Sequence, residues 1–105
     1  MSDAKPSHYE RLRAEYADVF VALEQLGTAV SNAGPLDART VHLVQLGAAA
    51  AAHSEGAVHS HVRRALAAGA TEAQIRHALV ALISTIGFPT VTAALSWVDD
   101  VLDNR

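Results

Sequence analysis

The chain contains no cysteine among its 105 residues. This absence excludes disulfide bonds, thiolate metal ligands and any redox reaction that runs through a thiol. Aromatic side chains are also scarce, at 5% of the sequence, whereas 22 residues are alanine and 50% of the chain is hydrophobic. Because alanine buries little apolar area, such a chain depends on close helix packing and has apolar surface to spare. We therefore expect one small domain that assembles as a homo-oligomer.

Long apolar runs and clustered basic residues are missing as well. The longest apolar-rich stretch, ALVALISTIGF at 78–88, is too short to span a bilayer. The first residues, MSDAKPSHYE, lack the apolar core of a signal peptide. The formal net charge is −3 without a basic run, which argues against nucleic acid as a partner because phosphate binding needs clustered Lys and Arg. The sequence therefore predicts a cytoplasmic protein with neither membrane nor nucleic acid as a partner.

Helix boundaries are marked by short polar signals. An S-x-x-E capping box at Ser7 and a T-x-x-Q box at Thr71 indicate two helix starts, because each box satisfies backbone N–H groups that have no partner in the helix. Asp37 and Ser54 are placed to begin two more helices. The sequence Asn-Ala-Gly-Pro at 32–35 is a turn that separates the first helical segment from the rest.

Between these signals, apolar residues recur every three or four positions, which is typical of amphipathic helices. No segment alternates steadily between apolar and polar residues, so no strand is expected. The helix after Asp37 is apolar on nearly every side and should be central. The sequence thus predicts an all-α bundle of five to six helices over residues 7–105, preceded by a flexible tail at residues 1–6.

Histidine is concentrated in one stretch, HSEGAVHSH at 53–61, and His42 lies one segment earlier. At 100° per residue, His59 points about 200° away from His61, so these two should not form a pair. If His42 and His61 face each other across packed helices, two imidazoles would suit acid–base chemistry near neutral pH. The alternative is that both are ordinary helix histidines, bonded to a carbonyl group or to water. A zinc site would need His53 to converge with them, and because no H-E-x-x-H motif is present we expect no metal.

Two pieces of the sequence, HVRRALAAGATEAQIRHAL and GFPTVTAAL, resemble the carboxymuconolactone decarboxylase family, which includes the alkylhydroperoxidase-D-like proteins. In the family a histidine begins the first piece, and G-A-T-x-x-E/Q-I is typical. The likeness covers residues 36–95, and the preceding segment YADVFVALEQLGTAV also fits. The resemblance implies an all-α subunit of the alkylhydroperoxidase-D-like type that assembles as a trimer or a hexamer. It also implies a pocket near the junction of the two central helices and a neighbouring subunit.

The redox branch of this family carries a glutamate, a C-x-x-C pair and a histidine in fixed spacing. Laid onto this chain, the histidine is His61, the cysteine positions fall on Ser54 and Ala57, and the glutamate position falls on His42. Peroxide reduction by such a site needs a sulfur nucleophile and a second sulfur that resolves the oxidised intermediate. Because serine and alanine replace both sulfurs, thiol peroxidase activity is not expected.

The decarboxylase branch does not need the cysteines, and its resemblance to this chain lies in the retained histidine. It implies a cofactor-independent carboxy-lyase, or a related acid–base enzyme, acting on a small carboxylate-bearing lactone or keto acid. His61 would donate the proton and His42 would be its catalytic partner. The residues expected to contact the substrate are Ser54, Ala57 and Arg64 (or its neighbour Arg63). The alternative is a non-catalytic binding or scaffold member of the family that has lost the redox site.

Overall fold

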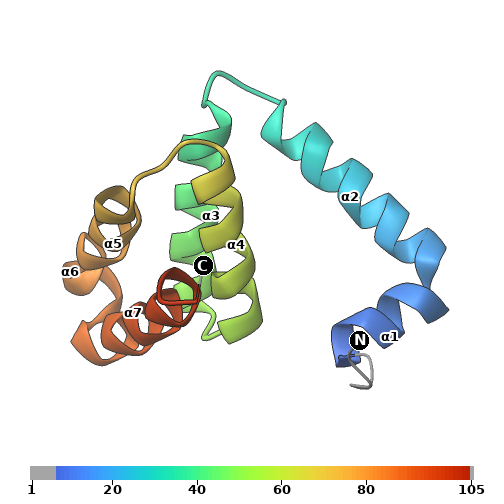
Figure 1. Ribbon diagram of the computed structural model, residues 1–105. Coiled ribbons are helices and arrows are strands. Elements are labelled where there is room, and N and C mark those ends of the chain that lie inside the picture. The colour runs from blue at the N-terminus through green and yellow to red at the C-terminus, as the bar shows by residue number, and fades with distance from the viewer. Residues whose placement is uncertain (1–6, 105) are drawn as a thin grey trace. The chain divides into compact units, whose positions relative to one another are not determined.

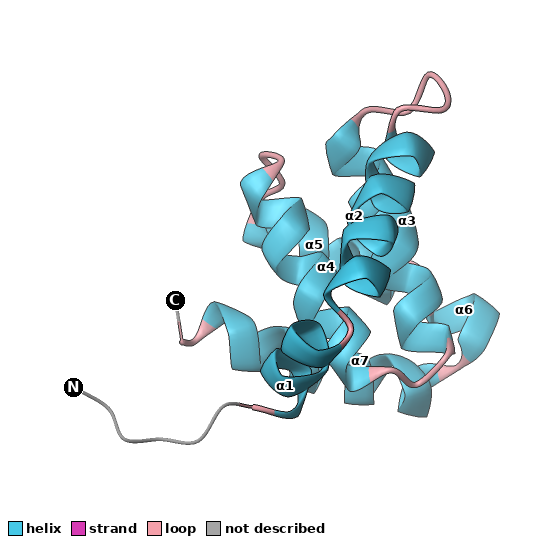
Figure 2. Cartoon of the chain, turned by 90° about the vertical axis from the view of Figure 1, so that its right-hand side faces the viewer, coloured by secondary structure: helices cyan, strands magenta, loops and turns pink. Residues whose placement is uncertain are grey.

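The computed structural model describes residues 7–104, and the tail predicted at residues 1–6 lies outside these described residues. Within them every regular element is a helix and no strand occurs (Figures 1 and 2), which confirms the all-α prediction. None of these helices is long and apolar enough to cross a bilayer. The chain divides into two compact units after Pro35. The expectation that residues 7–105 form a single domain therefore stays a prediction, and each unit is described by itself.

The first unit contains α1 (His8–Glu15) and α2 (Ala17–Ser31). The capping box at Ser7 forms as predicted, because its hydroxyl accepts from the backbone of Glu10 and the Glu10 carboxylate accepts from the backbone of Ser7. Tyr16, with φ −121° and ψ 47°, leaves the helical conformation and separates the two helices. No residue of either helix is buried.

Aromatic and charged contacts join α1 to α2. The rings of Tyr9 and Phe20 meet edge to face, with their centroids 5.5 Å apart. Arg13 forms an ion pair with Glu24. Because both charged side chains are about half exposed, this pair adds little to stability.

The second unit contains α3 (Ala38–Ala51), α4 (Glu55–Ala67), α5 (Glu72–Val80), α6 (Ile83–Ile86) and α7 (Phe88–Leu102). The chain reverses between α3 and α4, which lie side by side (Figure 1). Helix α7 packs against both of them, and α5 packs against α3 and α7. The sequence predicted one helix after Thr71, but the structure divides it into α5 and the single turn α6, which is capped by Gly87.

The predicted helix starts of this unit are present. Asp37 accepts a hydrogen bond from the backbone of Thr40 (2.8 Å), and the bonds with Thr40 lower the pKa of the Asp37 carboxyl group. Thr71 and Gln74 form the second capping box. Ser54 precedes α4 as predicted, yet its side chain makes no capping hydrogen bond.

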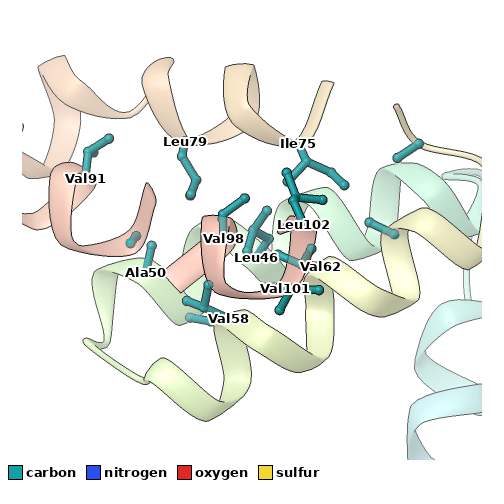
Figure 3. Packing of buried hydrophobic residues seen from close by; sticks show 14 residues of the cluster. Leu46, Ala50, Val58, Val62, Ile75, Leu79, Val91, Val98, Val101 and Leu102 are labelled. Atoms are coloured by element: carbon teal, nitrogen blue, oxygen red, sulfur yellow. The ribbon is translucent and has the colours of Figure 1, made fainter. Parts of the chain in front are cut away.

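The core lies where α3, α4, α5 and α7 meet (Figure 3). Leu46 of α3, Val62 of α4 and Val98 of α7 are each 0% exposed. Ile75 and Leu79 of α5 point toward them from the other side (Figure 3). Because the buried side chains are aliphatic and small, the helices approach closely, as the alanine-rich composition indicates.

Candidate functional site

The hairpin of α3 and α4 brings His42 and His61 together. His42 lies in the first half of α3 and His61 at the middle of α4, and the chain reverses between the two helices, which brings the two side chains next to each other. Their ring centroids are 5.9 Å apart and the ring planes are tilted by 35°. Both side chains are half-buried. The structure therefore joins the two residues that were predicted to be catalytic, while their catalytic role stays a prediction.

The surroundings of the two rings favour their neutral forms. Burial lowers the pKa of His42, the nearby positive charge of Arg64 lowers it further, and a hydrogen bond with the side chain of Gln45 acts in the opposite direction. Burial also lowers the pKa of His61, followed by the charges of Arg64 and His42. The Nδ1 atoms of both rings are buried without a hydrogen-bond partner among the described residues. The pair thus combines neutral imidazoles with unused hydrogen-bonding capacity, which is a perturbed environment typical of functional sites.

These lowered pKa values predict a dependence of stability on pH. An unfolded histidine titrates near pH 6.5, so below that pH the unfolded chain binds more protons at these two positions than the folded chain does. The free energy of unfolding should therefore fall as the pH is lowered through about 6.5 and below. Urea unfolding at a series of pH values measures this slope. The double variant His42→Gln, His61→Gln should show a shallower fall than the wild type, and an equal fall would contradict the prediction.

The other residues predicted to contact the substrate lie on α4 or at its start. Ser54 and Ala57 are half-buried and lie seven and four residues before His61, which places them on the same side of the helix. Arg64 is exposed and lies one turn beyond His61, close enough to shift the pKa of both rings. Contact between these residues and a substrate stays a prediction.

The remaining histidines of the HSEGAVHSH stretch do not join the pair. His59 Nε2 lies 3.4 Å from the Asp100 carboxylate, on another side of α4 as its helical phase predicted. His53 is exposed and lies beyond the end of α3, so it does not share a helix face with His42. In residues 7–104, no group of three or more His, Cys, Asp or Glu side chains is arranged to hold a metal ion.

The turn after α3 places His53 in the left-handed region, with φ 55°. Its N–H donates to the carbonyl of Ala50 (3.0 Å), and the next N–H, from Ser54, donates to the carbonyl of Ala49 (3.0 Å). Helix α4 ends in the same way, but there Gly69 takes the positive φ of 98°. A residue with a side chain costs about 1 kcal/mol in this conformation, whereas glycine does not.

Replacement of His53 by glycine should therefore raise the free energy of unfolding by about 1 kcal/mol. The matched change, Gly69→Ala, should lower it by a similar amount, because a Cβ at Gly69 meets no atom within 4 Å and only the backbone conformation is strained. Urea unfolding of both variants measures the two effects. A loss of stability in His53→Gly would show instead that contacts of the His53 side chain outweigh its backbone strain.

A hollow of about 460 Å³ lies on a different face of α3, where sequence reasoning predicted no site. Its lining is almost entirely apolar and consists of Thr40, Leu43, Val44, Gly47, Ala48, Ala51, Ala78, Leu82 and Ile86. Thr40 lies about 200° around α3 from His42, so this hollow is not the predicted pocket that contains both histidines. The feature of the sequence that could have indicated this hollow is the series of small residues on this face of α3. A Cβ at Gly47 would lie only 3.1 Å from Leu82 Cδ1, so glycine permits the close approach of α3 to Leu82.

Comparison with known proteins agrees with the motifs. The model of the carboxymuconolactone decarboxylase family matches residues 15–100. No curated protein and no solved structure matches the chain. The family match includes all of α2 to α6, most of α7 and both histidines of the pair. Because it spans most of the sequence, the chain belongs to the carboxymuconolactone decarboxylase family.

Proposed function

We propose that this protein is a cofactor-independent lyase, or a closely related acid–base enzyme, that acts on a small carboxylate-bearing lactone or keto acid. The observation that carries the proposal is the His42–His61 pair, whose rings lie 5.9 Å apart with two buried Nδ1 atoms that lack partners. Family membership supports the class of reaction, and the absence of cysteine removes the thiol chemistry of the redox branch.

The proposed reaction needs one proton and no oxidant. The bond between the substrate carbon and its carboxylate breaks, carbon dioxide leaves, and the electron pair stays on the carbon. His61 then donates a proton to that carbon, while His42 shares the proton with His61 and holds it in position. Arg64 contributes a fixed positive charge that attracts the carboxylate before the bond breaks.

A substrate screen followed by product analysis tests this proposal. Thermal-shift measurements against small lactone acids and keto acids would identify ligands, and carbon dioxide release from those ligands would be measured in buffer without added metal or thiol. Decarboxylation of at least one ligand supports the proposal. Ligand binding without turnover would favour the non-catalytic alternative. Peroxide reduction with a dithiol donor would contradict the proposal, which expects no thiol peroxidase activity.

The proposal includes a homo-trimer or homo-hexamer and a cytoplasmic location. Large apolar side chains support assembly, since Val44 and Phe88 of the second unit are each more than half exposed. An exposed apolar surface of this kind is typical of subunit interfaces. Light scattering coupled to size-exclusion chromatography gives the mass directly, and a monomer at all concentrations would contradict this part of the proposal.

A further inference from the structure

The rings of His42 and His61 lie 5.9 Å apart, both Nδ1 atoms are buried without a hydrogen-bond partner, and no acidic side chain of the described residues pairs with either ring. In the described part of the chain, the charges that shift the pKa of the pair are the Arg64 guanidinium and, for His61, the other imidazole; no carboxylate is among them. Gln45 on α3 contributes a neutral hydrogen bond to His42.

The carboxylates on α7, which packs against α4, are engaged elsewhere. Asp100 lies beside His59, which points about 200° away from His61. Asp99 bonds to Arg76 of α5 at 2.6 Å. Neither of these acids shifts the pKa of the pair. Within the described residues, no carboxylate is therefore placed to stabilise an imidazolium at this pair.

The proposed reaction needs a protonated imidazole, but the charges around the pair favour neutral rings unless the substrate changes those charges. The reaction consumes one proton, yet burial and Arg64 keep the unliganded pair neutral near pH 7. An anion close to an imidazole favours its protonated form. We infer that the substrate carboxylate supplies the missing negative charge, so that the His42–His61 pair takes up one proton from solvent as the substrate binds.

That proton is the one delivered to the product, an inference that rests on the proposed function. The bound carboxylate and the protonated pair neutralise each other. When the carbon–carbon bond breaks, the negative charge moves from the carboxylate to the carbon, and the new C–H bond takes the proton from the imidazolium. Carbon dioxide and the protonated product leave, and the pair returns to its neutral form. Each turnover thus consumes one proton, taken up at binding rather than after the chemical step.

Proton NMR of the histidine rings tests this coupling without any turnover. The Cε1–H signals of His42 and His61, assigned by their loss in His42→Gln and His61→Gln, would be titrated with pH in sodium chloride and in sodium acetate at equal ionic strength. Acetate serves as the carboxylate probe, and acetamide added to the chloride sample is its neutral counterpart. We expect acetate to raise the titration midpoint of at least one of the two rings by about one pH unit, and acetamide to leave both unchanged.

Two results would overturn the inference. One is the same midpoint for both rings in acetate and in chloride, and the other is an equal shift with acetamide, which would show that charge is not the cause. Arg64→Gln should reduce the acetate effect, whereas the exposed, remote change His77→Gln should leave it as in the wild type. The carbon dioxide assay separates the two claims. If acetate shifts the midpoint but no acid is decarboxylated, the lyase proposal is wrong and the coupled protonation stands. If an acid is decarboxylated but acetate causes no shift, the coupled protonation is wrong and the lyase proposal stands.

Discussion

Replacement of His61 by glutamine is expected to lower kcat/KM for decarboxylation by about 100-fold or more, which is the range that a positioned proton donor contributes. Glutamine keeps a polar side chain of similar size but exchanges no proton near neutral pH. Because His61 is only half-buried and its Nδ1 has no partner in the described structure, the change removes no internal hydrogen bond. The rate of carbon dioxide release from a substrate found in the screen is the measurement.

The matched control for this variant is His77→Gln, the same substitution at an exposed histidine of α5. It should keep the wild-type rate, and both variants should keep the wild-type unfolding midpoint to within a few degrees. If the His61→Gln variant keeps the wild-type kcat/KM, His61 does not take part in the mechanism. A large fall in stability would instead indicate that His61 has mainly a structural role.

Replacement of Leu46 by alanine is expected to lower the free energy of unfolding by about 3 kcal/mol. Leu46 is 0% exposed and belongs to the cluster where α3 meets α4, α5 and α7. Removal of its side chain loses apolar burial and leaves a cavity that neighbouring helices cannot close fully, because each helix is already packed on the others. Urea unfolding followed by circular dichroism measures the change.

Leu36→Ala provides the same substitution outside the core, since Leu36 is 54% exposed and precedes α3. Its cost should stay below about 1 kcal/mol. Equal losses for Leu36→Ala and Leu46→Ala would mean that Leu36 is covered in solution. A loss below about 1 kcal/mol at Leu46 would contradict the core described here.

The sequence predicted the helices well where local chemistry determines them. The capping boxes at Ser7 and Thr71 form as expected, because both partners of each box lie within one turn of the chain. The break at Tyr16 was also foreseeable, since Asp18 is a favourable residue for the first turn of a new helix. The division between α5 and α6 was not predicted, because no glycine or proline marks it.

The candidate site was predicted in part. Family spacing identified His42 and His61, and helical phase separated His59 from them. Two features could not be read from local patterns. The left-handed conformation of His53 depends on how α3 and α4 are joined, and the apolar hollow depends on the distance between α3 and Leu82. Both result from tertiary packing, which one sequence does not specify position by position.

The hairpin that joins His42 to His61 has a consequence for the order of events during synthesis. The two histidines are only nineteen positions apart along the chain. Loop closure over so short a distance costs little entropy, and local contacts of this kind form quickly. Because both helices of the hairpin precede α7 in the sequence, the segment that carries the paired histidines is synthesised before the last helix of the core.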